Sequence, residues 1–129
     1  MWDGTSLNFN GDVGANYATF YEDRDELGMT AGTQDPGTSV LGTMLPAFDA
    51  GAGSFGTMDI YIDYYAWAHF QKSIRAVGVA WNSAHRYMGR TNGIWRDFNA
   101  INAITIKTNA NTPDEGFGIN SRFTLYGII

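Results

Sequence analysis

The stretch that decides the fold reads Met58-Asp59-Ile60-Tyr61-Ile62-Asp63-Tyr64. Its even-numbered residues are all apolar or aromatic, whereas its odd-numbered residues include both aspartates. Successive side chains of a β-strand point to opposite faces, so this alternation places one face on a core and the other in water. Burial of one face only is typical of antiparallel sheets. The stretch therefore predicts an antiparallel, all-β fold.

The same period of two residues recurs elsewhere in the chain. Residues 75–81 place Val77, Val79 and Trp81 on one side and three small residues on the other. Further runs with a strand pattern cover residues 7–10, 15–21, 40–45, 103–107 and 122–126. Turn-forming residues lie at positions 82–83, 91–93 and 109–116. Short strands at this spacing predict a single antiparallel β-sandwich, jelly-roll-like, over residues 1–129.

The first half of the chain carries weaker signals. Residues 28–42 are rich in Gly, Thr, Ser, Asp and Pro, which predicts an exposed loop, and residues 46–56 have similar loop chemistry. Mixed charges at residues 20–29 leave a short helix open, with a solvated turn or edge as the favoured alternative. Residues 1–7 are expected to form an N-terminal arm.

The composition excludes several classes of function. The chain has 129 residues, 44% of them hydrophobic, which is enough for one domain with one core. A net charge of −5 argues against nucleic-acid binding, which needs clustered Lys and Arg. We expect no signal peptide, and no apolar run reaches the roughly 18 residues of a membrane span. The absence of cysteine excludes disulfides and fits folding in a reducing cytoplasm.

No residue pattern favours catalysis or a bound cofactor. Residues 51–56 match G-x-G-x-x-G by letter, but a dinucleotide site needs a strand before this motif and a helix after it. His69 and His85 form no metal-ligand pair, and no serine lies in a nucleophile elbow. Asp59 and Asp63 would lie about 13 Å apart along a strand, wider than the roughly 5–9.5 Å between glycosidase carboxylates. We therefore predict a protein that is not an enzyme and that carries no cofactor and no metal.

Two alternatives stay open for ligand binding. Oxygen-bearing side chains at Asn10, Asp12 and Asn16 could ligate calcium, although they are fewer than in a dedicated loop. Aromatic residues could form a sugar-binding patch, but most of them are expected to fill the core or a subunit interface. These residues are Tyr61, Tyr64, Tyr65, Trp67, Trp81, Tyr87 and Trp95.

Several marks of the chain, taken in order, resemble a domain of tailed-bacteriophage virion proteins. Residues 7–17, Leu-Asn-Phe-Asn-Gly-Asp-Val-Gly-Ala-Asn-Tyr, resemble the R-F-N-G-D-x-G-x-N-Y opening of that domain. The later marks are Phe55-Gly56 with Ile60, Ile62 and Tyr64, then Phe70-Gln71-Lys72, then Gly93-Ile94-Trp95 with Ala100, Ile101 and Ile104. Residues 120–128, Asn-Ser-Arg-Phe-Thr-Leu-Tyr-Gly-Ile, are similar to the terminal G-S-R-x-T-L-Y-G-L.

The resemblance implies a jelly-roll-like structural domain and no enzyme, because the shared residues are glycines, turn residues and core aromatics. The chain departs from the pattern at Asn120, where glycine is usual, and in its bulky residues 95–98 and charged residues 22–26. These departures put any shared ligand in doubt.

The resemblance also implies a place in the virion. With no tail-attachment or coiled-coil segment beside the domain, we expect a capsid cement or decoration protein. It would be made in the host cytoplasm, form a homotrimer on the capsid surface and bind the major capsid protein. The alternative is the receptor-binding tip of a tail fibre, which recognises a host-surface glycan or protein. A glycan depolymerase is the third and least favoured reading.

Partner contacts are expected in exposed segments, because loops and termini can become ordered on binding. Trp2 is a candidate anchor, since an exposed tryptophan usually needs a partner, and the alternative is that it folds back on its own domain. The predicted partner-binding residues are Trp2, Gly28, Thr33, Asp35, Pro36 and Gly37. We expect contacts with the major capsid protein and with further copies of the chain, and none with nucleic acid or a membrane.

Overall fold

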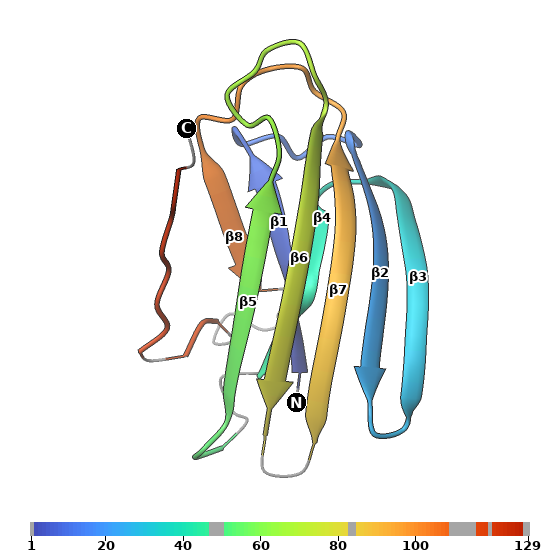
Figure 1. Cartoon of the computed structure of the whole chain (residues 1–129), viewed down its shortest axis with the longest axis vertical. Coiled ribbons are helices and arrows are strands. Elements are labelled where there is room, and N and C mark those ends of the chain that lie inside the picture. The colour runs from blue at the N-terminus through green and yellow to red at the C-terminus, as the bar shows by residue number, and fades with distance from the viewer. Residues whose placement is uncertain (1, 47–50, 83–84, 109–115, 119, 128–129) are drawn as a thin grey trace.

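Eight antiparallel strands form two packed sheets in the computed structural model (Figure 1). The structure describes residues 2–46, 51–82, 85–108, 116–118 and 120–127, with the backbone alone at positions 2, 3, 44 and 46. The strands are β1 (Trp2–Phe9), β2 (Tyr17–Asp25), β3 (Gly28–Gly37), β4 (Val40–Pro46), β5 (Phe55–Ile62), β6 (Lys72–Trp81), β7 (Arg86–Trp95) and β8 (Ile104–Thr108).

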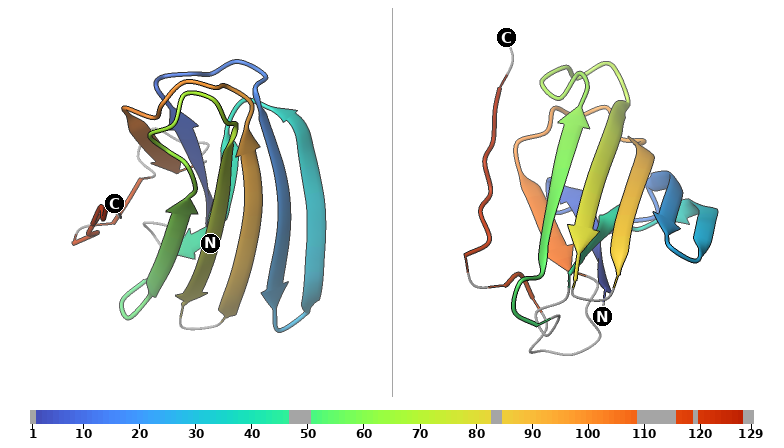
Figure 2. Two further views of the ribbon diagram at one scale, coloured as in Figure 1. Left: turned by 45° about the horizontal axis from the view of Figure 1, so that its top comes forward. Right: turned by 60° about the horizontal axis from the view of Figure 1, so that its bottom comes forward.

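The strands divide into a small and a large sheet. The three-stranded sheet has the order β4-β1-β8, and the five-stranded sheet has the order β3-β2-β7-β6-β5. The sheets face each other across one core (Figure 2). The predicted all-β, antiparallel sandwich is therefore confirmed.

The core is a cluster of aromatic and aliphatic side chains from both sheets. Phe9 of β1 lies with its ring centroid 5.5 Å from that of Trp95 and 6.2 Å from that of Tyr17. Ile60 and Ile62 of β5 pack against this cluster, as the alternation at residues 58–64 predicts. The other buried members are Leu7, Val40, Ile74 and Ile101.

Small residues line the inner side of the large sheet where β4 crosses it. Ala76, Gly78 and Ala80 of β6 are buried, so Val77, Val79 and Trp81 point outward. A Cβ at Gly78 would overlap with the hydroxyl of Thr43. The two sheets therefore approach so closely here that glycine and alanine are required inside, and the larger side chains of β6 must face solvent.

Two expectations for the first half of the chain are wrong. Residues 28–42 are no loop, because β3 and the start of β4 occupy them. The expected N-terminal arm is β1, the central strand of the small sheet. Residues 20–29 form no helix but the exposed turn of the β2–β3 hairpin with the strand ends beside it, as the favoured alternative of a solvated turn or edge predicts. The Asp25 carboxylate closes this turn by accepting the backbone N–H groups of Leu27 and Gly28.

The physical reason lies in the position of each strand. β3 is an edge strand that pairs only with β2, so glycines and a proline are tolerated there. β1 is buried between two strands although it contains polar residues. Its backbone groups form hydrogen bonds with the strands on both sides, and polar side chains also find partners, as the Thr5 hydroxyl does by donating to the Thr43 carbonyl.

Two expectations for the second half also differ from the structure. Residues 91–93 form no turn but lie inside β7, paired on both sides. Residues 122–126, expected as a strand, are extended but belong to neither sheet. The predicted turn residues 109–115 lie outside the described residues.

We expect Gly78→Val to lower the free energy of unfolding by about 1–3 kcal/mol, because the added side chain overpacks the contact with Thr43. Urea denaturation measures this change. Gly116→Ala is the matched control, since nothing lies within 4 Å of a Cβ at that position. Equal stabilities of the two variants would contradict close packing of the sheets at Gly78.

Candidate functional site

The motif at residues 10–17 forms a loop that is fixed by the Asp12 carboxylate. One carboxylate oxygen accepts the indole N–H of Trp95 at 2.8 Å and the side-chain N–H of Asn16 at 3.0 Å. The other accepts the backbone N–H of Gly14 at 2.8 Å. Asp12 thus holds the β1–β2 loop to the core tryptophan of β7.

The backbone of the same loop is held by Tyr17 and Asn10. The Tyr17 hydroxyl accepts the backbone N–H of Phe9 and donates to the carbonyl of Asp12, both at 3.0 Å. Asn10 has a left-handed φ of 53°, and its side-chain oxygen accepts the backbone N–H groups of Asn102 and Ala103. The motif therefore joins two loops at one end of the sandwich and has a structural role.

The charge of Asp12 is stabilised by these contacts. Burial alone would raise the pKa of this carboxyl, but the N–H donors of Trp95, Gly14 and Asn16 together hold the pKa below its usual value of 3.8. The oxygens that were considered for calcium at Asn10 and Asp12 accept N–H groups. Among the described residues, no group of three or more His, Cys, Asp or Glu side chains is placed to hold a metal ion.

The outer face of the five-stranded sheet carries many exposed apolar side chains. Nine apolar or aromatic side chains of this face are between 40% and 71% exposed. They are Phe20, Met29, Phe55, Tyr61, Val77, Val79, Trp81, Met88 and Ile94. The strand register brings Phe55, Val77, Val79, Trp81 and Met88 together. Charged and polar side chains separate this group from the other four, namely those of Glu22, Arg24, Asp59, Arg75, Arg90 and Asn92. We call this solvent-facing side of the sheet the outer face. A group of large apolar side chains exposed in this way marks a candidate interaction site.

Arginines stack on the aromatic residues of the outer face. The Arg86 guanidinium lies 4.9 Å from the ring centroid of Trp81, and the Arg75 guanidinium lies 5.6 Å from that of Tyr61. Trp81 also stacks on Phe55, with centroids 6.5 Å apart. Exposed Trp, Tyr, Met and Arg together are typical of the centre of a protein–protein interface.

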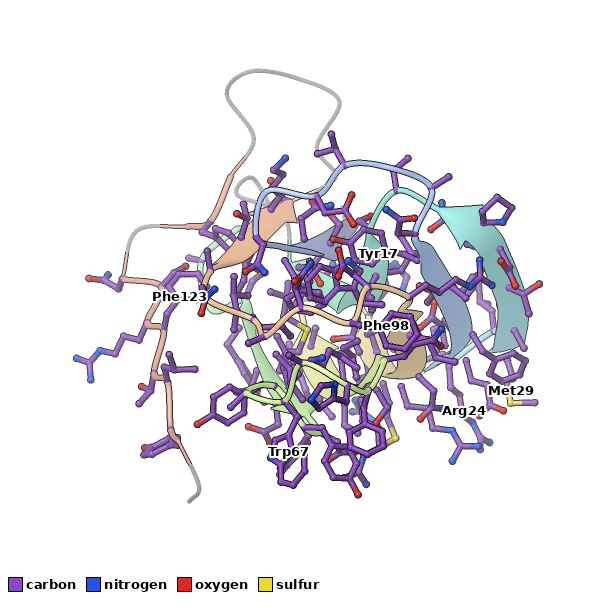
Figure 3. All side chains as sticks on the ribbon, turned by 90° about the horizontal axis from the view of Figure 1, so that it is seen from above. Tyr17, Arg24, Met29, Trp67, Phe98 and Phe123 are labelled. Atoms are coloured by element: carbon purple, nitrogen blue, oxygen red, sulfur yellow. The ribbon has the colours of Figure 1, made fainter. Side chains whose placement is uncertain are left out.

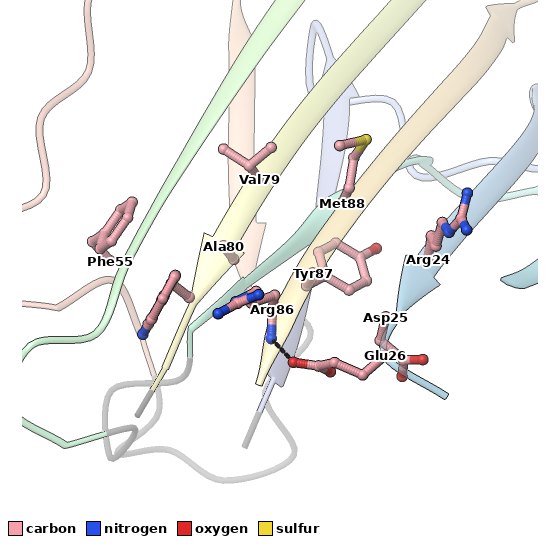
Figure 4. A pocket seen from close by; sticks show the side chains of 10 residues that line it. Arg24, Asp25, Glu26, Phe55, Val79, Ala80, Arg86, Tyr87 and Met88 are labelled. Carbon is pink, nitrogen blue, oxygen red and sulfur yellow. Dashed lines mark hydrogen bonds between the residues drawn. The ribbon is translucent and has the colours of Figure 1, made fainter. Parts of the chain in front are cut away.

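Two shallow hollows lie on the outer face. The first has a volume of about 470 Å³ and is lined by apolar side chains that include Phe55, Val79 and Met88 (Figure 4). Glu26 closes one side of it by accepting the backbone N–H of Arg86. The second hollow, of about 440 Å³, lies nearer the other end of the same sheet. Ser73 lines the second hollow, and its hydroxyl donates to the Asp63 carboxylate at 2.9 Å. Among the described residues, no histidine lines either hollow.

A second cluster of exposed aromatic residues lies on the β5–β6 and β7–β8 loops. The Phe70 ring lies 5.5 Å from that of Tyr64 and 5.9 Å from that of Trp67. Phe98 of the neighbouring loop is also exposed. Seen from above, Trp67 and Phe98 lie on this end of the sandwich, and Tyr17 lies between the sheets (Figure 3). We call Tyr64, Trp67, Phe70 and Phe98 the loop-end cluster.

A buried lysine holds the loop-end cluster in place. The ammonium group of Lys72 donates to the backbone carbonyls of Trp67 at 2.7 Å, Phe70 at 2.5 Å and Phe98 at 3.4 Å. Burial lowers the pKa of Lys72, and the Asp97 carboxylate opposes this effect. The cluster therefore sits on loops whose backbone path is fixed.

The aromatic residues are distributed differently from our expectation. Of the seven aromatics singled out in the sequence, Trp95 and Tyr87 are buried, whereas the other five are exposed in this chain. The Tyr87 hydroxyl donates to the carboxylate of Asp23, and burial raises the pKa of this carboxyl. These five do not fill the core of a single copy, and the subunit interface that is the other part of the expectation stays a prediction.

The predicted partner-binding residues fall at three places. Thr33 and Asp35 of β3 line the second hollow of the outer face, and Asp35 pairs with Arg96 at 2.6 Å. Gly28 and Pro36 are exposed on the same edge strand, but Gly37 is buried. The backbone of Trp2 pairs with β4, and its side chain lies outside the described part of the chain.

Sequence reasoning named several exposed aromatics as a possible patch, but it missed that they fall on two separate surfaces, and it missed the aliphatic residues of the outer face and Lys72. The signal for the outer face was present, because the small residues of β6 can face inward only if Val77 and Trp81 face outward. The sequence contained less indication that Lys72 would bind the loop carbonyls, since a single lysine beside aromatic residues predicts no particular contact.

Comparison with protein-family models, with curated proteins and with solved structures finds no match for this chain. The resemblance to tailed-phage virion proteins stays a prediction. The described residues contain no helix of the length and apolar character needed to cross a membrane.

We expect Asp12→Asn to lower the free energy of unfolding at pH 7 by about 1–3 kcal/mol, because charge-assisted hydrogen bonds are lost. The pKa of Asp12 is depressed in the folded state, so its contribution is complete above pH 3.8 and is lost as the pH falls through the folded pKa. The difference between wild type and variant should therefore shrink in acid. Urea denaturation at pH 7 and pH 3 tests this.

Asp59→Asn is the matched control for this substitution, because Asp59 is exposed and makes no hydrogen bond or ion pair in the described residues. It should change the stability by less than about 0.5 kcal/mol. A difference between wild type and Asp12→Asn that stays constant between pH 7 and pH 3 would show that the carboxylate charge is not what holds the loop.

Proposed function

We propose that this chain is a structural protein of a tailed-bacteriophage particle, namely a capsid decoration protein that stabilises the head shell. The observation that carries the proposal is the outer face, where arginine-stacked aromatics and large aliphatic side chains stand exposed in register. A surface of this chemistry is suited to bury against a protein partner. The ordered marks from residues 7–17 to residues 120–128 support a virion as its setting.

The proposed partner is the surface of the major capsid protein. Burial of the outer face between neighbouring shell subunits would favour the assembled shell by mass action and so oppose the pressure of packaged DNA. The net charge of −5 keeps the unassembled protein soluble despite its apolar face. A homotrimer on the capsid surface is the assembly that the family resemblance favours. The role proposed is non-enzymatic.

The test uses heads that lack the protein, to which purified protein is added back. Wild type should raise the temperature at which the heads release DNA. Val79→Asp places a carboxylate between Thr57 and Met88 on the outer face. It should weaken binding to heads about tenfold or more and abolish the protection, because a charge would have to be buried in an apolar part of the interface. Release of DNA is measured with a DNA-binding dye during heating.

Val13→Asp is the matched control, because Val13 is exposed on a loop away from the outer face. This variant should protect the heads as wild type does. Equal heat resistance of heads with and without wild-type protein would overturn the proposal. A copy number near a dozen per particle, in place of hundreds, would also count against it.

A second candidate function is the receptor-binding tip of a tail fibre, and the loop-end cluster favours it. Tyr64, Trp67 and Phe98 are exposed at one end of the sandwich on loops that are held by Lys72. Aromatic side chains that are fixed in this way give contact area to a host glycan or protein at low entropic cost.

The two candidates differ in which tryptophan matters. If the chain is a tip, Trp67→Ala should lower binding of labelled protein to host cells about tenfold or more, as expected for an interface anchor. Trp81→Ala on the outer face should leave that binding unchanged. If the chain is a decoration protein, Trp81→Ala should weaken binding to heads, and Trp67→Ala should not.

A further inference from the structure

β5 is a long sheet edge that lacks the usual protection. Within the described residues the two sheets have four edge strands, β3, β4, β5 and β8. β3 and β4 contain Pro36 and Pro46 and have irregular registers, and β8 has five residues that include Lys107. β5 pairs with β6 in a regular register over all its eight residues and contains neither proline nor lysine. Natural proteins cover or disrupt an edge of this kind.

The core is also open along β5. The inward-facing residues of β6, such as Ile74 and Ala76, are buried. By contrast, Ile60 and Ile62 of β5 and Ile106 of β8 are only partly buried. A seam of apolar surface therefore runs between β5 and β8, where the two sheets end.

The C-terminal segment, residues 120–127, has the properties of a strand without a sheet. Its sequence alternates, with Phe123 and Leu125 on one side and Arg122, Thr124 and Tyr126 on the other. Leu125 and Tyr126 are each 83% exposed, and Phe123 is 60% exposed. The segment runs alongside the sandwich near β8 and points in the same direction as β5 of its own chain (Figures 1 and 2).

We infer that the C-terminal segment of one copy adds as a strand to the β5 edge of a second copy. Phe123 and Leu125 then enter the apolar seam beside Ile60 and Ile62, which buries the side chains that a single copy leaves in solvent. Backbone pairing supplies the affinity, and the alternating side chains supply the register. This interface does not depend on the proposed function.

Charge complementarity favours β5 as the acceptor. Asp59 points outward from the middle of β5, and Arg122 lies on the outward side of the added strand. Neither forms an ion pair in the described residues, so each is available to the other. β8 offers the opposite sign, because its charged residue is Lys107.

The chain contains no cysteine, so introduced cysteines report the contact directly. In the parallel register that sets Arg122 beside Asp59 and Phe123 beside Ile60, Thr124 lies beside Tyr61. Tyr61→Cys on β5 and Thr124→Cys on the C-terminal segment are made in separate chains that carry tags of different size. After mixing and mild oxidation, we expect a disulfide-linked dimer with one chain of each tag. Adding Leu125→Asp to the Thr124→Cys chain should reduce the yield of this dimer at least tenfold.

Two other occupants of the edge give different products. A Tyr61→Cys chain that cross-links only with its own kind would show that two β5 edges pair directly, and would overturn the inference. A Thr105→Cys/Thr124→Cys chain that closes an internal disulfide, with no product from the mixture, would show that the segment pairs with its own β8. That result would overturn it as well.

Charge reversal gives an independent readout in sedimentation velocity. Asp59→Arg alone and Arg122→Asp alone should each shift the protein towards the monomer, and the double variant should restore the oligomer. Val13→Asp, at an exposed position away from both strands, should leave the oligomer intact. A wild type that stays monomeric at every concentration, or a double variant that fails to restore the oligomer, would contradict the assigned contact.

Discussion

The hydrogen bond from the Trp95 indole to the Asp12 carboxylate is the contact on which the arrangement of the two sheets depends. Trp95 ends β7 of the large sheet, and Asp12 follows β1 of the small sheet, so the contact joins the sheets at one end. Phe9 and Tyr17 pack on the same indole and bury it. Because the indole N–H would otherwise be buried without a partner, the position of the loop and the packing of the core are coupled.

The sequence predicts the fold class because a strand that is buried on one face alternates regularly between apolar and polar residues. The alternation at residues 58–64 predicts a sheet with one solvent-exposed face, and Ile60 and Ile62 do pack against the core. The same reasoning fails for β1 and β3. β1 is polar because its burial comes from neighbouring strands, and β3 has loop-like composition because an edge strand needs only one partner. Composition alone does not distinguish these cases from an arm or a loop.

The candidate surfaces were harder to predict because they depend on the distance between the sheets. Val77 and Trp81 have the character of core residues, but they point outward because the small residues of β6 face inward. At Gly78, Thr43 of the other sheet leaves no room for a side chain. Thr33 and Asp35, which were chosen as loop residues, do line the outer face, but as part of an edge strand. Their placement follows from pairing with β2, which no local pattern encodes.

The three hydrogen bonds that the Lys72 ammonium group donates to the described residues of these loops all go to main-chain oxygens. The side chain at position 67 or 98 can therefore change, while the hydrogen bonds from Lys72 that set the path of the backbone remain. A loop of this kind separates the conditions for folding from those for recognition, since mutations at its exposed positions have little effect on stability. Selection can diversify this end of the molecule on a constant scaffold, and the same property makes residues 64–70 a suitable place to randomise for new binding specificities.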